Sequence, residues 1–200
     1  MWLTKKINLN WDFRLIKSKR LSKFKNIEHA FFNKKSGKST TVYKRFNDSA
    51  NSSDIKKNVF NNLKIIGKKI IFDQKKVILL NQIHSDKFYY IDKKSKLNNF
   101  KFYGDALITN ISNTPIGVLT ADCAPILLFD KQMKMTAAIH AGWKGAYKGI
   151  IKKVVKFMIK KGCSPSDITA VIGPCISLKS YEVKQDFIKK FIKNDKKTIL

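Results

Sequence analysis

The sequence predicts an α+β fold, a mixed α/β sandwich packed around one core. The chain has 200 residues, which is the length of a single domain with enough chain to bury a core. Its hydrophobic fraction of 44% is ordinary for a globular protein. The predicted strands and helices follow one another in no regular alternation, which favours a mixed architecture. We divide the chain into a basic lead-in over residues 1–26 and one domain over residues 27–200.

The first half of the chain contains two recognisable elements. Residues 27–32 are apolar enough to form a strand, and the polar residues 33–39 that follow indicate a turn. A helix is predicted over residues 55–67, where Ser53 or Asp54 can cap its first turn. The apolar residues that share one face of this helix are Ile55, Val59, Leu63 and Ile66.

The second half is richer in strands. Short β-branched and aromatic runs predict strands at residues 77–80, 88–91, 105–109, 116–120, 126–129, 135–139 and 168–172. One long helix is predicted over about residues 144–161, because an apolar stripe runs through it and its lysines lie mostly off that stripe. Gly162 fits the position just after the end of this helix. A last basic helix is predicted near residues 183–194.

The net charge of +27 would attract nucleic acid or another anionic partner. The lysines, however, are spread through every segment, and no arginine-rich arm or aromatic RNA-binding motif stands out. We therefore expect a general surplus of surface lysine rather than a nucleic-acid-binding protein, although the charge still favours an anionic substrate such as phosphate.

Compartment and redox state follow from what the sequence lacks. No apolar run approaches membrane-spanning length, and no signal-peptide core follows the N-terminus, so we expect a cytoplasmic protein without a membrane partner. Three cysteines in unrelated contexts make a disulfide framework improbable and favour reduced thiols or a metal ligand. The oligomeric state cannot be read from these features.

Two histidines and one cysteine each end an apolar, strand-like run. They are His84, Cys123 and His140. Such residues are held at the rim of a sheet, and a set of three leaves a fourth position free, as in a catalytic zinc site. Taken one at a time, each is equally compatible with a hydrogen-bonded histidine or a packed cysteine. The ligands are far apart in sequence, so only convergence in the fold would make a site.

The run from His140 to Gly145 is a tight strand-to-helix corner. Gly142 and Gly145 permit close backbone approach, and the free N–H groups of the helix start could bind phosphate. The alternative is that both glycines serve only the corner. Asp122 and Asp105 are candidate acids, bases or partners of a metal-bound histidine, and Asp105 fits a turn or cap as well.

The remaining cysteines and the third histidine are assigned mainly structural roles. Cys175 could be a fourth ligand or a reactive thiol but is expected to be structural, and Cys163, just after a helix stop, is expected to be incidental. His29, at the start of a predicted strand, is expected to be structural.

These motifs together resemble the laccase-domain family, whose members carry the names polyphenol oxidase, purine nucleoside phosphorylase and multicopper-oxidase-like protein. The matching runs are residues 81–84, 104–109, 120–128, 138–145 and 172–183. Residues 31–37 are similar to the family's N-terminal Phe-x-x-Arg-x-Gly-Gly run, and residues 46–47 to its Leu-Asn pair.

The resemblance implies the family's fold and a zinc site made by His84, Cys123 and His140, with copper as the alternative metal. It implies phosphorolysis of adenosine, inosine, guanosine or methylthioadenosine, and deamination of adenosine, with purine nucleosides and phosphate as ligands. The catalytic set would be Cys123, His140 and Asp122. Lys34, Asn47, Gly142 and Gly145 would bind substrate and phosphate.

The chain departs from the family pattern at three points. Lys34 stands where the family usually has arginine, which keeps the charge but loses the bidentate fork, and Ser36 replaces a glycine. The sequence also ends at Leu200, where family members generally continue, so we expect a copy shortened at its C-terminus.

Three alternatives to the zinc nucleoside enzyme remain open. The first is a copper oxidase, although one three-ligand site cannot supply the several coppers that four-electron reduction of oxygen needs. The second is a hydrolase that uses Cys123 and His140 without metal, or a factor that edits peptidoglycan precursors. The third is a basic nucleic-acid-binding protein without catalysis.

Overall fold

The computed structural model describes residues 15–33, 38–40, 53–71, 77–95, 102–183 and 185–194. The strands are β1 Leu15–Ile16, β2 Phe31–Phe32, β3 Phe88–Ile91, β4 Ala106–Thr109, β5 Ala124–Asp130, β6 Met135–Ala141 and β7 Ile168–Ile172. The helices are α1 Lys56–Ile71, α2 Trp143–Tyr147, α3 Ile150–Lys160 and α4 Gln185–Asn194, with 3₁₀ turns η1 Leu21–Lys23 and η3 Leu178–Ser180.

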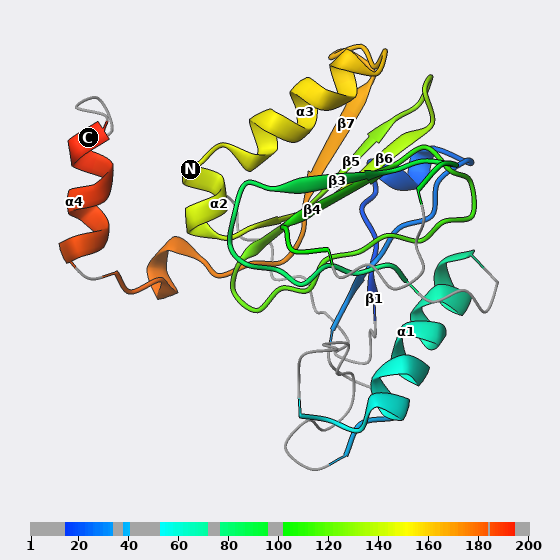
Figure 1. The fold of residues 1–200 in the computed structure, drawn as a ribbon, viewed down its shortest axis with the longest axis horizontal. Helices are drawn as coiled ribbons and strands as arrows, with labels where there is room; N and C mark the ends of the chain where they lie inside the picture. The colour runs from blue at the N-terminus through cyan, green and yellow to red at the C-terminus, as the bar shows by residue number, and fades with distance from the viewer. Residues whose placement is uncertain are drawn as a thin grey trace.

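Five strands form the central sheet in the order β3-β4-β6-β5-β7 (Figure 1). β3 and β4 pair in parallel, while the pairs β4–β6, β6–β5 and β5–β7 are antiparallel. Helices therefore pack against a mixed sheet, and the predicted α+β class is confirmed. In the β5–β6 pair, Pro125 lies opposite His140 and Leu127 lies opposite Ala138.

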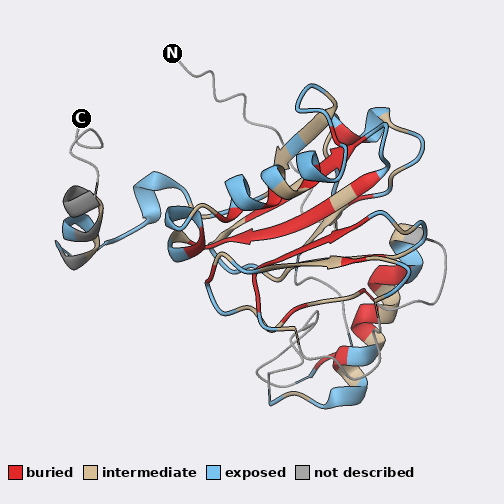
Figure 2. Cartoon of the chain, turned by 45° about the horizontal axis from the view of Figure 1, so that its top comes forward, coloured by how far each residue is buried: buried red, intermediate tan, exposed pale blue. Residues whose placement is uncertain are grey.

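Helix α3 covers one face of this sheet (Figure 1). Ile150, Val154 and Met158 recur every four residues and are each 0% exposed, so they form the buried stripe of the helix. They pack on alternate residues of the sheet such as Ile126 and Ile139. In Figure 2 the central strands beneath α3 are coloured mostly as buried, whereas much of α3 is coloured as exposed.

The long helix predicted over residues 144–161 is wrong in one respect, because the structure divides it into α2 and α3. Gly149 lies between them at φ 80°, a left-handed conformation that ends the helical path and that glycine adopts without steric cost. The two helices therefore point in different directions, and Tyr147 and Ile151 of the predicted stripe are exposed.

The opposite face of the sheet is covered by extended segments, and α1 packs on these segments. Residues 77–80 and 116–120, predicted as strands, form only one isolated bridge among the described residues, at Ile78–Ile116. Val59, Leu63 and Ile66 of α1 pack on Val77, as the predicted helix face requires. Ile55 departs from that prediction: it precedes the first helical residue and is 62% exposed.

The N-terminal and C-terminal ends of the described chain contact different parts of the fold. Of the predicted strand over residues 27–32, only β2 forms, and it pairs with β1, which lies inside the basic lead-in. Leu21 in that lead-in is 0% exposed, so its second half packs onto the fold. Helix α4 stands at the far end of an extended segment (Figure 1), and its Phe187 and Phe191 contact Trp143 and Tyr147 of α2.

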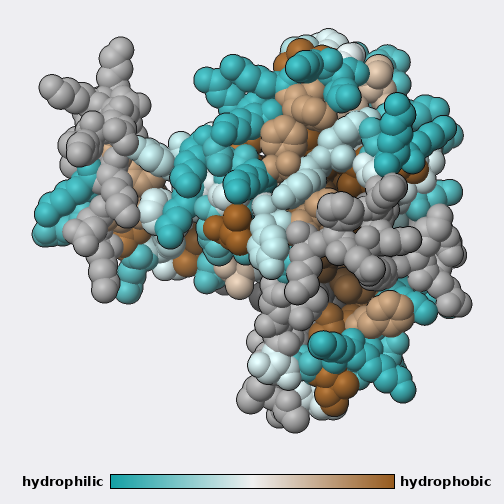
Figure 3. Space-filling view, viewed as in Figure 1, coloured by the Kyte–Doolittle hydropathy of each residue, from teal (hydrophilic) through white to brown (hydrophobic). Residues whose placement is uncertain are grey.

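Hydrophilic and hydrophobic residues are interspersed on the surface. On the face shown in Figure 3, both kinds are visible over α3 and α1. Within the described ranges, no helix is both long and apolar enough to cross a membrane. The cytoplasmic location and the domain boundary at residue 26 stay predictions.

Candidate metal centre

The structure brings His84, Cys123 and His140 together. One ligand atom from each residue lies within 4.8 Å of the other two. The Cys123 sulfur is 3.9 Å from His84 Nε2, and the two imidazole rings stand nearly perpendicular with centroids 4.7 Å apart. His140 comes from the end of β6, Cys123 directly precedes β5, and His84 lies in the loop before β3. The pairing of β5 with β6 brings Cys123 and His140 to the same end of these two strands.

Asp105 holds both histidines in place. Its Oδ1 accepts hydrogen bonds from His140 Nδ1 at 2.8 Å and from the His84 backbone N–H at 3.0 Å. Its Oδ2 accepts from the Ser85 backbone N–H at 2.6 Å and from the Ser85 hydroxyl at 2.7 Å. Of the roles open to Asp105, the structure therefore shows the partner of a histidine and not a local cap. Because His140 Nδ1 donates to the carboxylate, its Nε2 carries the lone pair that a metal requires.

The charge of Asp105 is stabilised although the side chain is fully buried. Desolvation by burial raises the pKa of the carboxyl, but hydrogen bonds from Ser85 and His140 outweigh it, so the pKa lies below its ordinary value. A charged carboxylate is the form that holds His140 in the tautomer with hydrogen on Nδ1.

Two residues in the loops around the ligand group have left-handed backbone conformations. His84 has φ 55° and Asp122 has φ 72°, which are uncommon values for residues with a side chain. The hydrogen bond from the His84 N–H to Asp105 and the one from the Ile176 N–H to the Asp122 carbonyl (2.9 Å) hold them there. Such strain persists only where surrounding contacts enforce it.

Gln82 links two of these loops, and we did not single it out from the sequence. Its Nε2 donates to the Leu119 carbonyl and its Oε1 accepts from the Leu119 N–H, both at 2.7 Å. The amide thus imitates a strand partner and ties the segment before His84 to the segment before Cys123. The one available signal was its place between the apolar run 77–80 and His84.

Close packing accounts for both glycines of the corner. A Cβ on Gly142 would lie 2.8 Å from His84 Cδ2 and 3.2 Å from the Cys123 sulfur. A Cβ on Gly145 would lie 2.6 Å from the Ser85 carbonyl oxygen. Any side chain at either position would push the His84 loop away, so the glycines keep the three potential ligands together. Their use in phosphate binding stays a prediction.

The donor set fits a borderline transition metal. Burial and then the charges of Asp122 and Asp105 raise the pKa of the Cys123 thiol. A divalent cation reverses this preference, because it stabilises the thiolate directly. Two imidazoles and one thiolate suit zinc or copper. A metal-bound histidine usually donates its other ring N–H to a carboxylate, as His140 does to Asp105. His84 is exposed and Cys123 is half-buried, so the group is open to solvent on one side.

The other predicted site residues are outside the ligand group. Among the described residues, the exposed Asp122 carboxylate has no hydrogen-bond partner, and Cys175 is exposed outside the ligand group. Cys163 is 4% exposed and packs in the core. His29 accepts a hydrogen bond from the Ser18 N–H, which confirms a structural contact. Lys34 and Asn47 lie outside the described residues.

Comparisons with known proteins show the family of this chain. The family model described as "Multi-copper polyphenol oxidoreductase laccase" matches residues 28–199. The chain belongs to this laccase family. The predicted family resemblance is therefore confirmed, and it covers almost the whole chain.

Two curated proteins that are similar to this chain carry a more specific name. A purine nucleoside phosphorylase of Bacteroides thetaiotaomicron is 32% identical over 195 residues, which is 94% of this chain and 72% of that protein. One from Clostridium acetobutylicum is 42% identical over 121 residues, or 60% of this chain and 50% of that protein. The crystal structure of Bacillus licheniformis hypothetical protein YfiH has a TM-score of 0.75 at 28% identity, covering 82% of this chain and 64% of that one. The chain thus spans between half and three quarters of these relatives.

Proposed function

We propose that this laccase-family protein is a zinc-dependent enzyme that acts on purine nucleosides, with His84, Cys123 and His140 as the metal ligands. The observation that carries the proposal is the convergence of these three ligand atoms within 4.8 Å of one another. It is supported by the 32% identity, over 94% of the chain, to a protein named purine nucleoside phosphorylase.

The residues around the centre have separate tasks. A zinc ion held there supplies Lewis-acid chemistry and water activation near neutral pH. Asp105 orients His140 and keeps the proton on its Nδ1. The exposed side of His84 is where substrate can approach. Asp122, which is exposed and next to Cys123, is the proposed proton carrier.

In phosphorolysis, a phosphate oxygen forms a bond to the ribose carbon while the bond to the purine nitrogen breaks and the purine leaves with a proton. We assign the phosphate to Lys34 and the Gly142–Gly145 corner, and substrate contact to Asn47. Support comes from Phe31, whose ring lies against Gly173. The Gly173 N–H in turn donates to the Pro125 carbonyl, two residues beyond Cys123. Phe31, three residues before Lys34 in the sequence, is therefore linked through Gly173 to the strand that follows Cys123.

In deamination, water adds to C6 of adenine and ammonia leaves. Asp122 would carry the proton from water to the departing nitrogen, the task that a non-ligand carboxylate has in zinc nucleobase deaminases. Both reactions place the purine at the same centre, so the presence of phosphate decides between them.

Product analysis of the zinc-loaded chain with adenosine, with and without phosphate, tests the proposal. We expect adenine and ribose phosphate only when phosphate is present, and inosine when it is absent. Cys123→Ser should abolish both products, whereas the matched variant Cys175→Ser, which changes an exposed cysteine outside the ligand group, should leave them unchanged. Full activity in Cys123→Ser would refute the assignment.

Two other reactions use the same residues. The family description favours copper as an alternative metal, and phenol oxidation by a copper-loaded sample would support it. A thiol hydrolase would use Cys123 with His140, and the ligand atoms of these two residues lie within 4.8 Å of each other. A chelator should silence either metal enzyme and spare the thiol hydrolase.

A further inference from the structure

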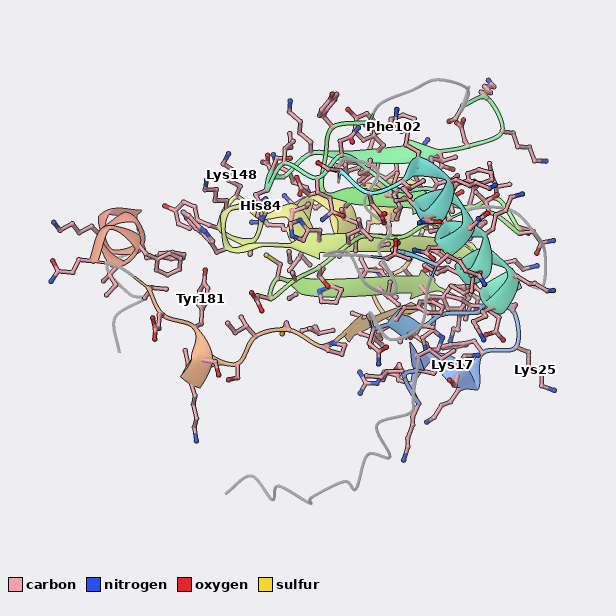
Figure 4. All side chains as sticks on the ribbon, turned by 90° about the horizontal axis from the view of Figure 1, so that it is seen from below. Lys17, Lys25, His84, Phe102, Lys148 and Tyr181 are labelled. Atoms are coloured by element: carbon pink, nitrogen blue, oxygen red, sulfur yellow. The ribbon has the colours of Figure 1, made fainter. Side chains whose placement is uncertain are left out.

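A cavity of about 490 Å³ lies on the same sheet face as His140 but toward the opposite end of the strands. Residues 25–30, the loop 111–116 and the sheet enclose it, and none of the three potential metal ligands lines it. Ala138 in its floor is two residues before His140, roughly 7 Å along β6, and points to the same side. Figure 4 shows His84 on the side of the sheet that faces α4 and Lys25 on the side away from it. The volume of the cavity is that of a small-molecule site.

The cavity is lined by both polar and apolar residues, and its floor is apolar. Side chains from the lead-in, the loop and the sheet contribute, namely Leu21, Ile111, Ile116, Leu127, Phe129 and Ala138. Leu21, Phe129 and Ala138 are at most 1% exposed, so this floor belongs to the rigid core. A preformed apolar floor favours a ligand with an apolar body.

His29 supplies a polar group in this apolar setting. It is 6% exposed, and its Nε2 accepts a 2.8 Å hydrogen bond from the Ser18 N–H. Burial and then the charge of Lys17 lower the pKa of His29, which favours the neutral ring. Because Nε2 accepts the Ser18 hydrogen bond, the proton of the neutral ring is on Nδ1.

The Nδ1 donor of His29 has no hydrogen-bond partner in the described part of the chain. Among those residues, Asp130 Oδ2 is the one side-chain atom that is both fully enclosed and unpaired. The unpaired Nδ1 is therefore accessible, and because His29 lines the cavity, the cavity offers a free N–H donor.

Charge at the rim favours an anion. Lys25 and Lys134 line the cavity, are exposed, and have no acidic partner among the described residues. The one acidic residue in the lining, Glu28, is already paired with Lys17 at 2.7 Å. The net charge around the opening is therefore positive.

We propose that this cavity binds a small organic acid, with its apolar body on the sheet and its anionic group near His29, Lys25 and Lys134. The site is separate from the metal centre and does not depend on the nucleoside chemistry. A ligand in it would contact Ala138 on the strand that carries His140.

Titration of the full chain with phenylacetate tests this site, with binding measured by calorimetry and by the imidazole ¹⁵N signals of the three histidines. We expect saturable binding with a Kd of about 1 mM or below. The His29 signals should shift, while those of His84 and His140 stay in place. Phenylacetamide, which lacks the charge, should bind more weakly, and inorganic phosphate should not compete.

Variants identify the contacts. His29→Gln keeps an acceptor for the Ser18 N–H but loses the Nδ1 donor, and should weaken phenylacetate about tenfold. The double change Lys25→Gln and Lys134→Gln, both on the surface, should weaken phenylacetate about fivefold and leave phenylacetamide unchanged. Lys160→Gln, an exposed lysine of α3 outside the cavity, is the matched control and should have no effect.

Several outcomes would overturn the proposal. They are the absence of saturable binding at about 10 mM, inorganic phosphate binding as tightly as phenylacetate, and full affinity in the double lysine variant. Loss of binding in Cys123→Ser would also overturn it, because the ligand would then occupy the metal centre. If His29→Gln does not fold, the two exposed lysines still decide the question.

Discussion

The Nδ1 atom of His140 lies 2.8 Å from Asp105 Oδ1, and the two side chains are 3% and 0% exposed. The same carboxylate also holds the backbone of His84 and Ser85. One buried aspartate therefore sets the direction of one potential metal ligand and the loop conformation of another.

Replacing Asp105 by Asn should weaken zinc binding by about 10- to 100-fold, because the His140 tautomer and the His84 loop both lose their charged acceptor. Competition with a chromogenic chelator measures this affinity. Asp86→Asn is the matched control, since Asp86 is outside the ligand group and pairs with Lys153 on the surface. Equal zinc affinity in the two variants would show that Asp105 does not support the metal.

Asp105 should also govern acid stability. Its pKa is lower in the folded chain than its ordinary value, so the unfolded chain takes up the proton first as pH falls. The stabilisation is fully present above the ordinary aspartate pKa of about 3.9 and is lost as pH falls through the lower folded value. Urea unfolding of wild type and Asp105→Asn across this range measures the effect. The two curves should converge at low pH, and a constant difference would contradict the assignment.

Gln82→Leu should lower the free energy of unfolding by about 1–3 kcal/mol, because the N–H and carbonyl of Leu119 lose partners in a part-buried setting. Zinc affinity should fall with it, since the loops before His84 and Cys123 are no longer tied together. Urea unfolding and zinc titration measure the two effects. Gln132→Leu, in the exposed turn between β5 and β6, should change neither.

The three cysteines should react with iodoacetamide at very different rates. Cys175 is exposed and should react first, whereas Cys163 is buried with its pKa raised to about 11 and should resist. Cys123 should react slowly without metal, because its pKa is raised, and zinc should protect it further. Peptide mass spectrometry follows each site separately. Labelling of Cys123 that zinc leaves unchanged would count against its role as a ligand, with Cys175 as the internal reference.

Where sequence and structure agree, the signal was local. The apolar spacing of Val59, Leu63 and Ile66 predicted one face of α1, and the short apolar runs predicted β3 to β7. Sequence and structure differ at two places. The apolar stripe predicted one helix, but the left-handed conformation of Gly149 divides it into two. Residues 77–80 and 116–120 have the composition of strands, but they cover the sheet without joining it.

By itself the sequence determined which side chains are available for chemistry, because the ends of strands and the identities of His84, Cys123 and His140 are local properties. The tertiary structure alone decided that the three converge and that Asp105, not Asp122, holds a histidine. It also decided that Gln82 ties two loops and that His29 faces a cavity. Each of these facts is a contact between segments distant in the chain, and such contacts arise only when the sheet and its loops have packed together.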